Sequence, residues 1–104
     1  MALRRALSVS PEAWDDAGTA AEYYSGIDDD LAYRFIEELV SALSFLWAYP
    51  LAGHPFYGRY RCIALKRFPY LVCYRVAGDT IRVLTIVHGQ RDPEWIHGRI
   101  DGRV

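Results

Sequence analysis

The sequence has no long hydrophobic run and few histidines and cysteines, and each shortage excludes a class of protein. Its apolar runs are far too short to cross a bilayer, and its first residues lack the apolar core and small-residue cleavage site of a signal peptide. We therefore expect a cytoplasmic protein with no membrane association. The three histidines and two cysteines show none of the spacings of a zinc site, so we expect neither a metal nor another cofactor.

The two cysteines, Cys62 and Cys73, fall in segments with the character of β-strands. These segments are close enough in sequence to lie side by side, so a cross-strand disulfide is geometrically conceivable. In a reducing cytoplasm, such cysteines more often behave as small buried hydrophobic residues. We expect both thiols to be buried and free.

A length of 104 residues leaves room for one hydrophobic core. Apolar residues make up 52% of the chain, which supplies that core and argues against disorder. Three Trp, eight Tyr and four Phe are more aromatic surface than so small a core can hide, and exposed aromatic residues favour interfaces. We predict a single domain over residues 1–104, in which residues 89–104 form a C-terminal tail.

The net charge of -1 conceals a polarity along the chain. Residues 1–49 carry nine acids against three arginines, a net charge of -6. Residues 50–104 carry nine basic residues against four acids, a net charge of +5. We expect one end of the molecule to be acidic and the other basic.

Local patterns predict a strand followed by two helices. Residues 3–9 alternate between apolar and polar side chains, as in a half-buried strand. The stretch Ser10-Pro-Glu supplies an N-cap, a first-turn proline and a first-turn acid, so a helix should begin there and end near Tyr24. A second helix is predicted over residues 31–49, after three aspartates that suit its N-terminus. Its apolar face comprises Leu31, Ala32, Phe35, Ile36, Leu39, Val40, Leu43, Leu46 and Trp47.

The second half of the chain predicts a small sheet. A turn-rich connection over residues 50–58 leads to β segments near residues 59–66, 70–76 and 80–88, the last two joined by a hairpin at Gly78-Asp79. The predicted order is β-α-α-β-β-β. This order is typical of an α+β domain in which a helical hairpin packs on a small, mainly antiparallel sheet. The alternation ends near Val87, so we expect the residues beyond it to add little to the fold.

Two stretches carry a resemblance to a known family: residues 67–75 (RFPYLVCYR) and residues 81–93 (IRVLTIVHGQRDP). The second is an apolar strand that ends in His88 and continues into an Arg-Asp-Pro tail. In this order of elements, residues 7–93 resemble the RelE/ParE toxins of type II toxin-antitoxin systems. The resemblance implies a RelE/ParE-like fold and a cognate antitoxin that wraps the toxin, binds operator DNA for the pair and can assemble with it as a heterotetramer. The toxin itself is then not expected to bind specific DNA.

The resemblance leaves two activities open. ParE-like members inhibit growth by binding DNA gyrase, whereas RelE-like members cut mRNA in the ribosome. A metal-independent ribonuclease needs a base, an acid and cations near the phosphate. The catalytic candidates for that activity are His88, Arg61, Arg67 and Arg91, with Asp92 or Glu94 as the complement of His88. The structural alternatives are a solvated sheet face for Arg61, Arg75 and Arg82, a loop anchor for His88, and a local Arg91-Asp92 ion pair.

Charge favours the binding activity over the nuclease. Proteins that act on ribosome-bound RNA neutralise many phosphates, yet this chain has a pI of about 6.3 and one lysine, Lys66. RNA-cutting members often start the middle β segment with Arg or Lys, where this chain has Phe68-Pro-Tyr. We therefore expect a non-enzymatic, ParE-like inhibitor of gyrase that acts in plasmid stabilisation, with the mRNA endoribonuclease as the alternative. The expected target-binding residues are Arg67, Arg75, His88, Arg91 and Trp95, and the antitoxin is expected on the helical hairpin and sheet edge.

Overall fold

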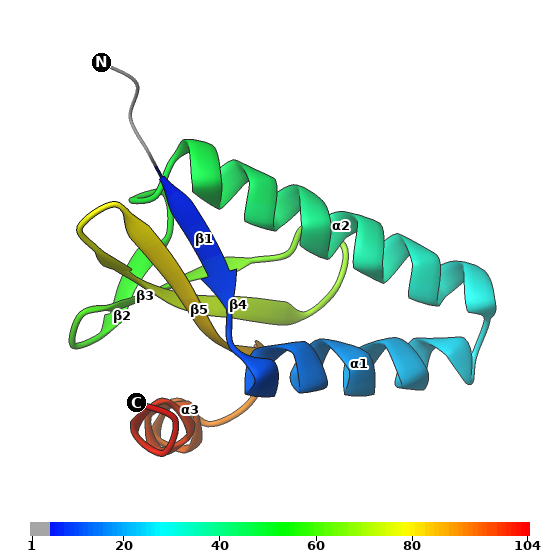
Figure 1. Cartoon of the computed structure of the whole chain (residues 1–104). Coiled ribbons are helices and arrows are strands. Elements are labelled where there is room, and N and C mark those ends of the chain that lie inside the picture. The colour runs from blue at the N-terminus through cyan, green and yellow to red at the C-terminus, as the bar shows by residue number, and fades with distance from the viewer. Residues whose placement is uncertain (1–4) are drawn as a thin grey trace.

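The computed structural model describes residues 5–104 as a five-stranded mixed sheet with helices on both faces (Figure 1). The elements in chain order are β1 (Ala6–Val9), α1 (Pro11–Ser25), α2 (Asp29–Ala48), β2 (His54–Tyr57), β3 (Tyr60–Ala64), β4 (Tyr70–Ala77), β5 (Thr80–His88) and α3 (Pro93–Asp101). The strand order is β1-β5-β4-β3-β2, and only the β1–β5 pair is parallel in this part of the chain. The predicted α+β class is confirmed. The predicted strand residues before Arg5 lie outside the described range.

The first long helix begins where the sequence predicts, and the second begins at Asp29, two residues before the predicted start. Ser10 caps α1, since its buried hydroxyl accepts a hydrogen bond from the Ala13 N–H at 3.1 Å and donates one to the Leu84 carbonyl at 3.2 Å. Asp28 caps α2 by accepting a hydrogen bond from the Asp30 N–H at 3.0 Å. Local capping chemistry therefore fixes both helix starts, and the Ser10 cap also ties α1 to β5.

The first hydrophobic core lies between the α1–α2 hairpin and one face of the sheet. From α2 it takes Phe35, Leu39 and Leu46, all fully buried. The wider predicted face is wrong at three positions, because the sheet and α1 cover a narrower arc of α2 than the apolar pattern spans. These positions are Ile36, Val40 and Trp47, whose exposed fractions are 38%, 50% and 49%.

The second hydrophobic core lies on the opposite face, beneath α3. Ile96 and Ile100 are buried there among residues of β3, β4 and β5. The prediction that residues beyond Val87 add little to the fold is therefore wrong. The α3 helix is short and buries only two residues, which are too few to show a helical period in the sequence. Its stability comes from tertiary packing and from the Asp92 cap, which accepts a hydrogen bond from the Glu94 N–H at 2.9 Å.

The β2 strand was also not predicted, because it lies within the turn-rich connection. It pairs antiparallel with β3, where His54 is opposite Cys62. Its pairing extends only to residues 60–62 of β3, so residues 63–65 have no strand partner on that side among the described elements. Within residues 5–104, no helix is both long and apolar enough to span a membrane.

A buried carboxylate fastens the C-terminal residues to α1 and β5. The Asp16 side chain is 6% exposed. Its Oδ1 accepts hydrogen bonds from Arg99 at 2.7 Å and Arg103 at 3.0 Å, and its Oδ2 accepts one from the Ile86 N–H at 3.1 Å. Among the described strands, β1 pairs with β5 only as far as Val83. Asp16 therefore accepts a backbone hydrogen bond from a part of the β5 edge that lies beyond this pairing. This network joins the acidic first half of the chain to the basic second half.

Acidification should weaken this attachment. Burial raises the pKa of Asp16, but hydrogen bonds from Arg103, the Ile86 N–H and Arg99 outweigh burial and hold the pKa below its usual 3.8. A carboxyl with a depressed folded-state pKa adds stability that is fully present above its unfolded pKa and is lost as the pH falls through the folded pKa. Below about pH 4, the free energy of unfolding should therefore fall more steeply in the wild type than in Asp16→Asn. Urea unfolding across a pH series measures this, and parallel curves would contradict it.

Candidate functional site

Most of the predicted target-binding residues lie at one end of the sheet, where β5 ends and β4 begins. They are Arg67, His88, Arg91 and Trp95. The Gly89 N–H donates a hydrogen bond to the Pro69 carbonyl at 2.7 Å, which joins the β3–β4 and β5–α3 connections. Tyr70 is opposite His88, with ring centroids 5.3 Å apart. Burial raises the pKa of Tyr70, whereas the positive charge of Arg91 acts in the opposite direction, so Arg91 also lies near this phenol.

An exposed pairing of cations with an aromatic ring is the main surface feature of this end. The Arg91 guanidinium lies 4.4 Å from the ring centroid of Trp95, and that of Arg99 lies 5.2 Å from it. Trp95 keeps 39% of its surface exposed. The suggested Arg91-Asp92 ion pair is not among the salt bridges of residues 5–104, since Asp92 caps α3 instead. Tryptophan and arginine are enriched at the centres of protein interfaces, so this cluster is suited to binding another protein.

His88 anchors the loop that follows β5. Its Nδ1 accepts a hydrogen bond from the Gln90 N–H at 3.2 Å, and its carbonyl accepts one from the Arg91 N–H at 3.1 Å. The structural interpretation of His88 is therefore confirmed. These bonds hold the loop that carries Arg91.

Arg75 lies apart from the other predicted target-binding residues. It is opposite Arg82 on β5 and Tyr60 on β3. Along β4 it is five residues from Tyr70, about 16 Å at the usual rise of a strand. The structure therefore does not place Arg75 in the Arg91–Trp95 region.

Arg61 has a role in the fold that the sequence did not predict. Its guanidinium donates hydrogen bonds to the carbonyls of Gly53 at 2.8 Å and Leu51 at 3.3 Å, which holds the α2–β2 connection against the sheet. The solvated-face interpretation is therefore wrong for Arg61. It holds for Arg82, which is exposed and donates to the Ser8 hydroxyl at 3.1 Å.

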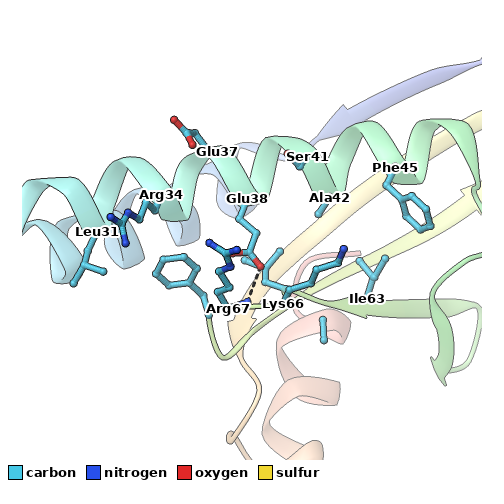
Figure 2. Close-up of a pocket in the computed structure, with 13 residues that line it drawn as sticks. Leu31, Arg34, Glu37, Glu38, Ser41, Ala42, Phe45, Ile63, Lys66 and Arg67 are labelled. Atoms are coloured by element: carbon cyan, nitrogen blue, oxygen red, sulfur yellow. Dashed lines mark hydrogen bonds between the residues drawn. The ribbon is translucent and has the colours of Figure 1, made fainter.

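A groove of about 690 Å³ lies between α2 and the β3–β4 connection (Figure 2). Its apolar part includes Phe45, which is 46% exposed, and Ile63. Its charged lining has both signs: Arg34, Glu37, Glu38, Lys66 and Arg67. Glu38 closes one part of the groove by accepting a hydrogen bond from the Arg67 N–H at 2.7 Å, drawn as the dashed line in Figure 2.

The sequence analysis placed an interface on the hairpin and sheet edge but did not identify this groove. The position of Phe45 could have indicated the groove from the sequence. Phe45 follows Phe35 by ten residues and therefore lies about 80° around the helix from the core-facing position. A large aromatic residue outside the apolar face of a helix marks a surface that a partner can cover. The groove also runs along the part of β3 that β2 leaves unpaired, since Ile63 and Ala64 line it.

The described residues offer no obvious metal centre. Among residues 5–104, no group of three or more His, Cys, Asp or Glu side chains could hold a metal ion.

Comparison with known proteins identifies the family. A family model described as "ParE toxin of type II toxin-antitoxin system, parDE" matches residues 7–93. Toxin ParE2 of Mycobacterium tuberculosis is 31% identical over 102 residues, 97% of each chain. Putative toxin Y4kP of Sinorhizobium fredii is 31% identical over 76 residues, 70% of this chain and 74% of that protein.

A solved structure shares the fold. "Chromosomal ParDE TA system from P. aeruginosa" matches with a TM-score of 0.72 at 23% identity, over 81% of this chain and 95% of that chain. The family model and the ParE2 relative each span most of the sequence. The chain therefore belongs to the ParE toxin family of type II toxin-antitoxin systems.

Proposed function

We propose that this ParE-family toxin inhibits growth by binding DNA gyrase in the cytoplasm, and that a cognate antitoxin neutralises it. Family membership supports the toxin assignment, and the structural neighbour is described as part of a ParDE toxin-antitoxin system. The gyrase target follows from the resemblance to ParE-like members. A role in plasmid stabilisation and a toxin-antitoxin heterotetramer belong to the same proposal.

The observation that supports the inhibitor over the nuclease is that Arg61, one of the four nuclease candidates, lies apart from the other three. Arg61 is opposite Tyr74 and His88 is opposite Tyr70, so the two lie about 13 Å apart along β4 at the usual rise of a strand. Arg61 is also committed to backbone carbonyls, and the Nδ1 of His88 to the Gln90 N–H. Arg61 and His88 are therefore too far apart to act on one phosphate together.

The target surface in this proposal is the end of the sheet that carries Arg67, Arg91 and Trp95. These side chains are exposed, and the loops that carry them are tied together by the Gly89–Pro69 hydrogen bond. An exposed tryptophan beside an arginine supplies apolar area and charge at one point, as binding hot spots do. A chain with a net charge of -1 is better suited to binding a protein than to neutralising the many phosphates of ribosome-bound RNA.

The antitoxin surface in this proposal is the groove between α2 and β3. It offers an apolar floor, charges of both signs and an unpaired strand edge, which together suit an extended segment or an amphipathic helix. Exposed aromatic residues on the two helices extend the surface that an antitoxin could cover. They include Trp14, Tyr23 and Trp47.

Two assays on one preparation test the target. The purified toxin should inhibit supercoiling by gyrase or trap cleaved DNA, and it should leave mRNA intact in a translating extract. Added antitoxin should relieve the inhibition. Codon-linked cuts in mRNA with normal supercoiling would reverse the proposal and give His88, Arg67 and Arg91 catalytic roles.

A Phe45→Ala substitution tests the antitoxin surface. It should weaken binding of the neighbour-encoded antitoxin by about tenfold or more, because an exposed aromatic ring in a groove can act as a hot spot. The matched control is Tyr33→Ala, which removes a ring that is 71% exposed on another side of α2. Calorimetry measures both affinities, and inhibition of gyrase should stay unchanged. Equal affinities for Phe45→Ala and the wild type would remove the groove from the interface.

A further inference from the structure

The two cysteines face each other across β3 and β4, directly in register. The Leu65 N–H donates to the Tyr70 carbonyl at 2.9 Å, so residues 65 and 70 form a hydrogen-bonded pair. Such pairs alternate with non-hydrogen-bonded pairs along an antiparallel ladder. Cys62 and Cys73 lie three positions further on and therefore form a non-hydrogen-bonded pair. In such pairs the Cα atoms are about 4.5 Å apart, within the range that a disulfide spans.

The two thiols are also close together. Interaction with Cys62, together with burial, raises the pKa of the Cys73 thiol. Both side chains lie in the second hydrophobic core, where Cys73 is fully buried and Cys62 is 6% exposed. The sulfur atoms are therefore adjacent without any movement of the strands, and Cys62 is the more accessible of the two.

We propose that Cys62 and Cys73 form a reversible oxidation site, which closes to an intramolecular disulfide when a small disulfide such as oxidised glutathione accepts the electrons. The Cys62 thiolate attacks one glutathione sulfur, which forms a mixed disulfide and releases one glutathione thiolate. The Cys73 thiolate then attacks the Cys62 sulfur and releases the second glutathione. Two thiol protons and two electrons leave the protein, and one S–S bond forms in exchange for the one consumed. This inference is independent of the toxin's target.

The α3 helix controls access to this site. Ile96 and Ile100 pack in the core that contains both cysteines. Tyr57 holds α3 in place, since its hydroxyl donates to Asp101 at 2.7 Å and its ring stacks on His97 at a centroid distance of 4.1 Å. A reagent as large as glutathione reaches Cys62 only when this attachment opens, so the oxidation rate reports the opening of α3.

The oxidation experiment uses the purified full chain and oxidised glutathione. Quenched samples are analysed by intact mass and by maleimide labelling, with Cys62→Ala and Cys73→Ala as controls. The wild type should lose the mass of two hydrogen atoms, stop reacting with maleimide and recover both properties with dithiothreitol. Its Tm should rise on the order of 10 °C. Stable glutathione adducts, disulfide-linked dimers, or no reaction while the denatured chain is oxidised would each overturn the proposal.

Tyr57→Phe tests the control by α3, because it removes the hydroxyl that binds Asp101 and keeps the ring that stacks on His97. It should speed disulfide formation several-fold. Tyr33→Phe is the matched control, since its hydroxyl is on an exposed ring of α2. Equal rates for Tyr57→Phe, Tyr33→Phe and the wild type would show that α3 does not limit access.

Discussion

A chain that ends at Gly89 should fail to fold. The truncation removes Ile96 and Ile100 from the second core, and burial of each such side chain contributes about 1.5–3 kcal/mol. It also leaves the Asp16 carboxylate buried without its two arginines, which costs about 3–5 kcal/mol. The sum is comparable to the whole stability of a small domain, about 5–15 kcal/mol. Circular dichroism should therefore show no cooperative thermal transition.

Two full-length variants separate the role of α3 in folding from its exposed side chains. Ile100→Ala removes a fully buried side chain and should cost about 2–5 kcal/mol. Trp95→Ala removes a ring that is 39% exposed and should melt close to the wild type. A truncated chain with a wild-type melting curve would show that α3 is dispensable for the fold.

Replacing Arg91 with alanine should abolish growth inhibition while leaving the fold intact. The side chain is exposed and lies over Trp95, so its loss removes a cation and an aromatic contact from the proposed target surface. A hot-spot contact contributes about 2 kcal/mol or more to binding, so the concentration that inhibits gyrase by half should rise about thirtyfold. Exposed substitutions of this kind change stability by less than about 0.5 kcal/mol. Colony counts, supercoiling assays and thermal melting measure the three effects.

Arg59→Ala is the matched control for that substitution. Arg59 is also exposed, but it lies in the β2–β3 turn, away from the Arg91–Trp95 region. It should retain full toxicity, and both variants should bind the antitoxin as the wild type does. Full toxicity of a folded Arg91→Ala variant would move the target surface to the helices.

The parts of the fold that the sequence predicts are those that depend on local chemistry. Ser10 and Asp28 cap their helices through contacts within three residues, and the Gly78-Asp79 turn lies within one hairpin. The Asp16 network depends instead on side chains up to 87 residues apart, and no local pattern indicates that pairing. The α3 helix was not predicted although Asp92-Pro-Glu offers the same start signals as Ser10-Pro-Glu, because only two of its residues are buried and the sheet beneath it defines that face.

The same distinction between local and long-range contacts applies to the candidate site. Loop residues next to a strand end, such as His88 and Arg91, could be grouped from the sequence because they are close along the chain. Arg61 and Arg75 could not, because their neighbours depend on strand register and on the β-bulge between Cys73 and Tyr74. The groove depends on the packing angle between α2 and the sheet, and no local sequence pattern reveals that angle.

The parallel pairing of β1 with β5 has a consequence for when the chain can fold during synthesis. Leu7 is opposite Ile81, so the first strand has no place in the sheet until the last strand has been synthesised. The β5 strand in turn carries the edge that Asp16 secures with Arg99 and Arg103, near the end of the chain. Contacts between such distant segments form late in folding. The five-stranded sheet of the toxin can therefore form only after residues 80–88 have been synthesised.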